Sequence, residues 1–118
     1  MVSKNSIGII TYGCSANHSE SEILAGLLEQ EGYHTIQIAG KNTEPEIIII
    51  NTCIVKKPTE TKILYKIRQL AGQGKKLIVA GCMPEIRQKE ILAVAPKACL
   101  VSTHQIRNIV KAVESVEN

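Results

Sequence analysis

The sequence contains no phenylalanine and no tryptophan, and only three of its 118 residues are tyrosine. Surfaces that bind unpaired bases rely on aromatic rings for stacking, so this composition argues against such a surface. No apolar run approaches the roughly eighteen residues of a membrane-spanning helix. The first residues lead directly into an apolar segment and do not have the pattern of a signal peptide. We therefore expect a cytoplasmic protein without a membrane partner, in which thiols stay reduced.

The rest of the composition is typical of one compact domain. Hydrophobic residues make up 44% of the chain and charged residues 21%, values that argue against disorder. Eighteen residues are isoleucine, a β-branched side chain that favours buried strands. The net charge of +3 permits contact with nucleic acid but is too small to indicate it. These features predict a single domain built around a sheet.

Apolar segments alternate with helical patterns along the chain. Strands are predicted at 7–11, 33–38, 47–50, 76–80 and 99–101, and helices at about 19–32, 58–72 and 84–93 and from 103 onward. Ser19 and Glu22 form a capping box at the start of the first helix. This order closely matches an α/β, flavodoxin-like domain: an open, mostly parallel five-stranded sheet, ordered 2-1-3-4-5, with helices on both faces. The link between the second and third strands is short for a parallel crossover, so the second strand is expected at an edge.

Three of the four cysteines follow predicted strands. Cys14 comes after the first strand, Cys53 after the third and Cys82 after the fourth. In the order 2-1-3-4-5 these strands are neighbours, and their carboxyl ends form the edge where ligands bind in such sheets. The three thiols can therefore converge on one point. Cys99 lies inside an apolar strand, where packing is its expected role.

Three convergent thiols leave more than one chemistry open. A structural zinc site takes four ligands, commonly with a C-x₂-C pair, which this sequence lacks. A [4Fe–4S] cluster is normally held by four thiolates, so three would leave one iron open to another ligand. A cysteine nucleophile needs a neighbouring base, for which His18 is the candidate. The spacing favours a cluster, with redox-active thiols as the second interpretation.

The residues around these cysteines are more specific than their spacing. The segments are Tyr12-Gly13-Cys14-Ser15-Ala16-Asn17-His18-Ser19-Glu20-Ser21-Glu22, Asn51-Thr52-Cys53-Ile54-Val55-Lys56 and Ala80-Gly81-Cys82-Met83-Pro84-Glu85. In this order they resemble the N-terminal domain of the radical S-adenosylmethionine methylthiotransferases, over nearly the whole chain. The stretch from Asn51 to Lys62 is most similar to the archaeal and eukaryotic branch, which methylthiolates N6-threonylcarbamoyladenosine beside the tRNA anticodon. Sister branches modify isopentenyladenosine in tRNA or a ribosomal protein.

The resemblance implies that Cys14, Cys53 and Cys82 bind an auxiliary [4Fe–4S] cluster, whose open iron holds the sulfur or methylthio group to be transferred. Residues 1–118 then correspond to the N-terminal domain alone, to which we assign no catalytic side chain. Full-length members add a radical domain with a second [4Fe–4S] cluster and S-adenosylmethionine, and a TRAM domain that binds RNA. The C-x₃-C-x₂-C motif of that radical domain does not occur here, so we expect these residues alone to be inactive. The alternative to an enzyme domain is a non-catalytic flavodoxin-like binding module.

Further polar residues flank the three cysteines. Asn17 and Asn51 are expected beside the cluster, where their side chains can hydrogen-bond its sulfides. Ordinary turn chemistry explains these asparagines equally well. Lys56, Lys57 and Lys62 can offset the charge of the cluster or contact tRNA phosphates. A solvated helix start is the more common role for such lysines.

Overall fold

The computed structural model describes residues 6–12, 15–38, 45–52 and 57–117. In chain order these residues form β1 (Ser6–Thr11), α1 (Ser15–Gln30), β2 (His34–Gln37), β3 (Ile47–Thr52), α2 (Lys57–Gly72), β4 (Lys76–Gly81), α3 (Met83–Ile86), α4 (Gln88–Val94), β5 (Cys99–Ser102), the 3-10 helix η1 (Thr103–Asn108) and α5 (Ile109–Glu117). Strands and helices follow one another in the predicted order, with β3 directly after β2, and the third predicted helix is divided into two. No helix in this part of the chain has both the length and the apolar character needed to cross a bilayer.

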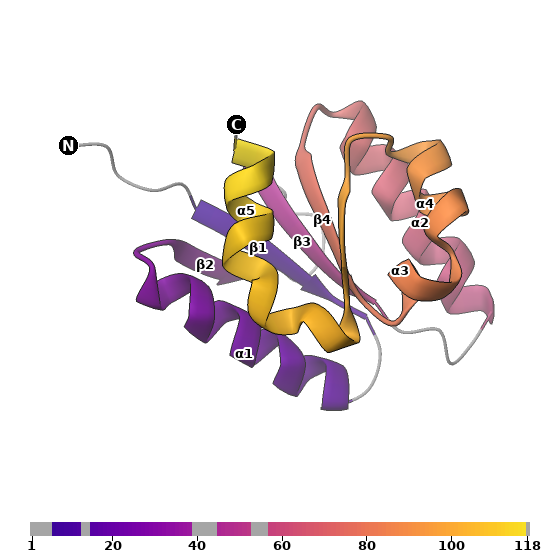
Figure 1. The fold of residues 1–118 in the computed structure, drawn as a ribbon. Helices are drawn as coiled ribbons and strands as arrows, with labels where there is room; N and C mark the ends of the chain where they lie inside the picture. Colours follow the sequence, from indigo (N-terminus) through magenta and orange to yellow (C-terminus); the bar gives the residue numbers. More distant parts are fainter. Residues whose placement is uncertain (1–5, 13–14, 39–44, 53–56, 118) are drawn as a thin grey trace.

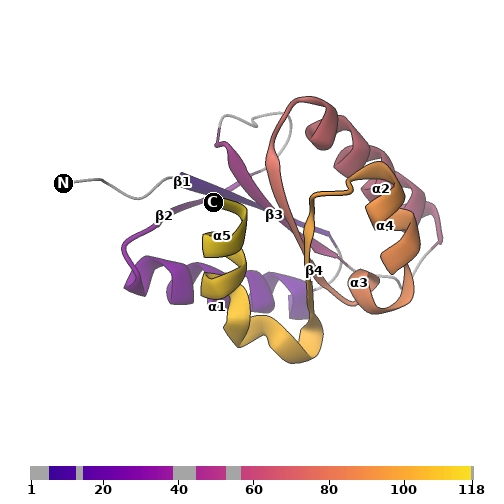
Figure 2. The same ribbon diagram turned by 45° about the horizontal axis from the view of Figure 1, so that its top comes forward.

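The five strands form one parallel sheet in the order β2-β1-β3-β4-β5. Helices α1 and α5 cover one face, and α2, α3 and α4 cover the other (Figure 1 and Figure 2). The predicted flavodoxin-like class is therefore confirmed, and so is the position of β2 at an edge. The central strand β3 is buried along its whole length, because helices lie on both sides of it.

The strand side chains alternate between two apolar layers. In β3, Ile49 faces the layer formed with α1 and α5, whereas Ile48 and Ile50 face the layer formed with α2 and α4. All three side chains are completely buried. Truncating a buried isoleucine to alanine costs about 2–5 kcal/mol, so this packing fixes the strand positions firmly. The same core positions the carboxyl ends of the strands, from which the cysteine-bearing segments continue.

Helix α1 begins earlier than its local sequence predicts. Its first residue is Ser15, whereas the capping box places the start at Ser19. Asn17 and Ser21, which are four residues apart and so share one helix face, are both buried. Tertiary contacts of these two residues, described below, favour a helix that extends past the local capping signal.

The chain after β4 also differs in detail from the prediction. The helix expected at 84–93 is divided into α3 and α4 at Arg87, whose φ of −116° and ψ of 30° lie outside the helical region. The last helix starts as the 3-10 helix η1, so its α-helical part begins only at Ile109. Cys99 lies in β5 as predicted, but it is half-buried rather than buried because β5 is an edge strand.

Candidate functional site

The carboxyl ends of β1, β3 and β4 lie side by side. Thr11 of β1 is paired with Asn51 of β3, and Thr52 of β3 is paired with Gly81 of β4. These residues lead directly into the three segments that carry the proposed ligands. The predicted strand order, which places the carboxyl ends of β1, β3 and β4 side by side, is thus confirmed.

Only one of the three proposed ligands can be located. Cys82 is exposed at this edge, immediately before α3. Cys14 and Cys53 lie outside the described residues. In the part of the chain that the structure describes, no three His, Cys, Asp or Glu side chains are grouped to hold a metal ion. The assignment of the three thiols as ligands therefore stays a prediction.

Asn51 connects the end of β3 to both sides of the loop that contains Cys14. Its completely buried side-chain amide donates to the main-chain oxygen of Asn17 at 2.9 Å and to Oγ of Ser21 at 3.0 Å. Its main-chain oxygen accepts a hydrogen bond of 2.9 Å from the N–H of Tyr12. Tyr12 precedes the Cys14 loop and Asn17 follows it. One residue of β3 therefore holds both stems of that loop.

Thr52 connects the end of β3 to the turn that contains Cys82. Its buried hydroxyl donates to the main-chain oxygen of Ala80 at 2.7 Å and accepts from the N–H of Met83 at 3.1 Å. Its main-chain oxygen accepts from the N–H of Cys82 at 3.5 Å and from the Asn17 side chain at 3.1 Å. The residue directly before Cys53 is therefore bonded to the stems of both other cysteine loops.

The hydroxyl groups of Thr11, Ser21 and Thr52 in this network were not predicted from the sequence. Thr11 and Ser21 share a hydrogen bond of 2.6 Å between their side chains, and Ser21 also accepts from Asn51. One signal was present in the sequence. Asn51 and Thr52 continue a solid apolar strand, so their polar side chains had to be buried and hydrogen-bonded.

Gly81 lies closely against the end of β3. Its φ is 100°, in the left-handed region that favours glycine. A Cβ atom at this position would overlap the main-chain oxygen of Thr52 and would lie 2.9 Å from Oδ1 of Asn51. That Oδ1 atom is buried and has no hydrogen-bond partner among the described residues. The missing side chain of Gly81 allows the turn before Cys82 to approach β3 this closely.

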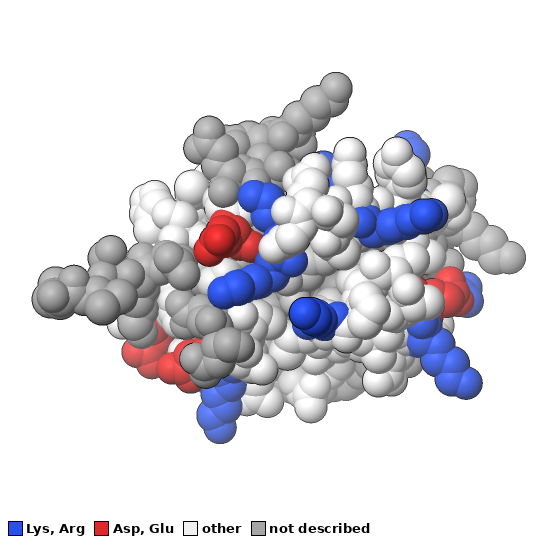
Figure 3. Space-filling view, turned by 90° about the horizontal axis from the view of Figure 1, so that it is seen from above, with Lys and Arg blue, Asp and Glu red and all other residues white. Residues whose placement is uncertain are grey.

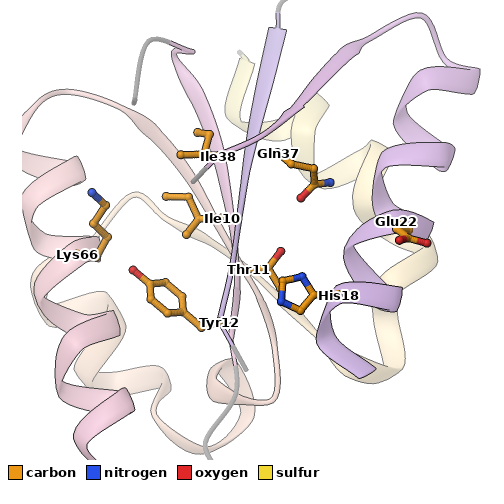
Figure 4. A pocket seen from close by; sticks show the side chains of 8 residues that line it. All are labelled: Ile10, Thr11, Tyr12, His18, Glu22, Gln37, Ile38 and Lys66. Carbon is orange, nitrogen blue, oxygen red and sulfur yellow. The ribbon is translucent and has the colours of Figure 1, made fainter. Parts of the chain in front are cut away.

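A cavity of about 540 Å³ opens beside this edge, between the ends of β1 and β2 and the helices α1 and α2. In Figure 4, Tyr12 and Lys66 lie on its α2 side, and His18 lies near Thr11 on its α1 side. The Tyr12 side chain is half-buried, and this burial raises the pKa of its phenol. No described cysteine lines the cavity. Cys14, four residues before His18, lies outside the described residues, so the pairing of a thiol with His18 stays a prediction.

A second cavity, of about 870 Å³, lies at the opposite edge of the sheet, where Lys75, Lys76 and Lys97 contribute to its wall. Figure 3 views the molecule from this end and shows more basic than acidic side chains. The carboxyl ends of α2, α4 and α5 also point here. The partial negative charge of these helix ends is sufficient to explain the nearby lysines, so no bound ligand is needed to account for them. Cys99 borders this cavity at the amino end of β5, and burial raises the pKa of its thiol. Cys99 is paired with Ile78, so it lies toward the amino end of the sheet, whereas Cys82 follows the carboxyl end of β4.

Of the other residues near the three cysteines, the structure places Met83 and Lys62. Met83 is completely buried and packs in the layer of α2 and α4. Lys62 is exposed on α2. Lys56 and the side chain of Lys57 lie outside the described residues. A contact of these lysines with a cluster or with RNA stays a prediction.

Most of this chain is similar to proteins of a known family. The model of a family described as uncharacterized protein family UPF0004 matches residues 6–103. A protein of Methanothermobacter thermautotrophicus, named a probable threonylcarbamoyladenosine tRNA methylthiotransferase, is 39% identical over 112 residues, which cover 93% of this chain and 26% of the relative.

Relatives with other names are similarly close. The ribosomal protein uS12 methylthiotransferase RimO of Gloeobacter violaceus is 37% identical over 109 residues, or 92% of this chain and 24% of the relative. The tRNA-2-methylthio-N(6)-dimethylallyladenosine synthase of Thermosipho africanus is 41% identical over 106 residues, or 90% of this chain and 24% of the relative. The chain thus spans about a quarter of the length of these curated relatives.

Proposed function

This chain belongs to protein family UPF0004, whose matched relatives are methylthiotransferases, and we propose that it is the sulfur-donating domain of such an enzyme. Three-quarters of the length of those relatives lies outside the match. The complete reaction is therefore assigned to the full-length protein, and these residues contribute one part of it.

The ligands in this proposal are Cys14, Cys53 and Cys82, which would hold an auxiliary [4Fe–4S] cluster. The supporting observation is the pair Asn51-Thr52, which precedes Cys53 and is hydrogen-bonded to the stems of both other cysteine loops. Thiolates are the usual ligands of such clusters, and three of them leave one iron free. When bound, the cluster would supply an open iron site that carries the sulfur destined for the substrate.

Asn17 and Asn51 have a defined role in this proposal. Their side-chain amides join the stems of the cysteine loops, because Asn17 donates to the main-chain oxygen of Thr52 and Asn51 donates to the main-chain oxygen of Asn17. Outer hydrogen bonds of this kind orient ligands and tune cluster potential. We assign both asparagines to the surroundings of the cluster and not to the transfer step itself.

The proposed substrate of the full-length enzyme is N6-threonylcarbamoyladenosine beside the tRNA anticodon, which becomes its 2-methylthio derivative. The motif from Asn51 to Lys62 and the similarity to the archaeal relative support this choice. Isopentenyladenosine tRNA and ribosomal protein uS12 are the alternatives, because relatives with those names match almost as well. A second [4Fe–4S] cluster, S-adenosylmethionine and most tRNA contacts are assigned to the rest of the enzyme, in the cytoplasm.

The experiment is anaerobic reconstitution of the domain with iron and sulfide, followed by iron and sulfide analysis and absorbance spectroscopy. We expect about four iron atoms per chain and the broad visible absorbance of a [4Fe–4S] cluster. Cys14→Ala, Cys53→Ala and Cys82→Ala should each lose most of the iron. Cys99→Ala is the matched control and should retain it. A colourless wild-type protein would support the non-catalytic binding module, and equal loss in all four variants would contradict the ligand set.

A further inference from the structure

Thr52 bonds to the residues on both sides of the turn that contains Cys82. Its hydroxyl donates to the oxygen of Ala80, the last residue before Gly81, and accepts from the N–H of Met83, the first residue after Cys82. Both bonds are buried, and their lengths of 2.7 and 3.1 Å lie within the usual range for protein hydrogen bonds. A single hydroxyl group thus spans the Gly81–Cys82 pair.

The turn held in this way has little stiffness of its own. Gly81 adopts a φ of 100°, and glycine populates many other conformations at similar cost. Helix α3, which follows, has only four residues, and its N-cap residue makes no side-chain capping bond. The placement of Cys82 therefore depends in part on contacts from outside the turn, and the Thr52 hydroxyl supplies two of them.

A purely structural explanation of these bonds is available. A buried hydroxyl must find a partner, and one strand carbonyl would be sufficient for that. The Thr52 hydroxyl makes one bond more than this requirement, because it also accepts from the N–H of Met83 at the start of α3. The main-chain oxygen of the same residue also accepts from the N–H of Cys82 at 3.5 Å.

We propose that Thr52 is a positioning residue, whose hydroxyl fixes the backbone on both sides of Cys82 so that the Cys82 thiol can serve as a cluster ligand. This inference rests on the proposed function, because it concerns how the proposed ligands are arranged. The side chain of Thr52 would not itself touch the iron. It would act through the turn that bears Cys82.

The test compares two substitutions at this position. Thr52→Val keeps the branched shape and removes the hydroxyl, whereas Thr52→Ser keeps the hydroxyl and removes a methyl group. Loss of an outer-shell partner typically weakens metal binding about 10–100-fold. We expect the reconstituted valine variant to lose iron to a chelator about tenfold faster than the wild type, and its cluster to have a shifted reduction potential. The serine variant should stay within about twofold of the wild-type rate.

Controls separate a positioning role from a general loss of stability. Thr35→Val is the control for the same substitution elsewhere, because Thr35 on the edge strand β2 also loses a hydroxyl bond, an exposed one to Glu29. Its chelation rate and potential should remain those of the wild type. Urea unfolding of each cluster-free variant measures stability separately.

The outcomes are distinguishable. If the wild type binds no cluster, the proposed function fails, and this inference fails with it. If the wild type binds a cluster but Thr52→Val has the same potential and chelation rate, only the positioning role is overturned. The positioning role is also overturned if the valine variant loses iron faster than the wild type and the serine variant, which keeps the hydroxyl, loses iron as fast as the valine variant.

Discussion

Asn51 and Thr52 are adjacent in β3, yet each holds both sides of a different cysteine loop. Asn51 bonds to Tyr12 and Asn17, which flank the Cys14 loop, and Thr52 bonds to both sides of the Gly81–Cys82 turn. Successive side chains of a strand point to opposite faces, so one reaches α1 and the other reaches α3. Two neighbouring residues are thus sufficient to join three loops that are far apart in sequence.

The first prediction concerns the amide of Asn51. Asn51→Ala removes a completely buried donor and leaves the carbonyl of Asn17 without it. We expect the free energy of unfolding to fall by about 1–3 kcal/mol, measured by urea denaturation of the cluster-free domain. Gln37→Ala, which changes an exposed amide, should stay within about 0.5 kcal/mol of the wild type. Equal unfolding midpoints for the two variants would contradict the role given to Asn51.

A second prediction compares two glycines. Gly81→Ala forces a Cβ against the main-chain oxygen of Thr52 and places alanine at a φ of 100°. The left-handed conformation alone costs about 1–2 kcal/mol, so the unfolding free energy should fall by at least this amount. Gly26→Ala in the middle of α1 meets no atom within 4 Å and should stabilise the protein by about 0.5–1 kcal/mol. If thermal unfolding shows the same sign for both changes, the close approach at Gly81 does not matter.

The fold could be predicted from the sequence because its strands are strongly apolar. The run Ile47–Ile50 indicates a strand covered on both faces, and such a strand belongs in the middle of a parallel sheet. The short link before it places β2 at an edge, as observed. The order of the strands then brings the carboxyl ends of β1, β3 and β4 together.

Features that depend on long-range hydrogen bonds could not be predicted in the same way. The capping box at Ser19 is a local signal, and the contacts of Asn17 with the end of β3 override it. The two bonds of the Thr52 hydroxyl join residues about thirty positions apart, and no periodic pattern in the sequence encodes them. Which buried polar group bonds to which becomes clear only from the packed structure.

The third prediction concerns pH. Burial raises the pKa of the Cys99 thiol above its ordinary value of 9.0, so the folded protein holds this proton more tightly than the unfolded chain does. The resulting stabilisation is complete below the unfolded pKa and is lost as the pH rises through the folded pKa. Unfolding free energies of the cluster-free wild type should therefore decline above about pH 9.

Cys99→Ala identifies the part of this decline that comes from the thiol. The variant lacks the ionising group, so its stability should fall less steeply than that of the wild type over the same alkaline range. The slopes are compared, because the substitution also removes some packing and shifts the absolute values. Parallel curves for the two proteins would show that the thiol ionises equally in the folded and unfolded states.

The last prediction concerns the division of labour within the full-length enzyme. Breaking a C–H bond of the substrate requires a radical source, and the sequence has no C-x₃-C-x₂-C motif to bind the cluster that would generate it. Delivery of sulfur is productive only when donor and substrate carbon are held together. With no aromatic platform and a net charge of only +3, these residues alone should bind tRNA weakly. We therefore expect the reconstituted domain, given S-adenosylmethionine, a reductant and threonylcarbamoylated tRNA, to form neither 5′-deoxyadenosine nor a methylthiolated nucleoside. A full-length relative assayed in parallel should form both. Mass-spectrometric detection of either product from this chain alone would overturn the assignment of radical chemistry to the rest of the enzyme.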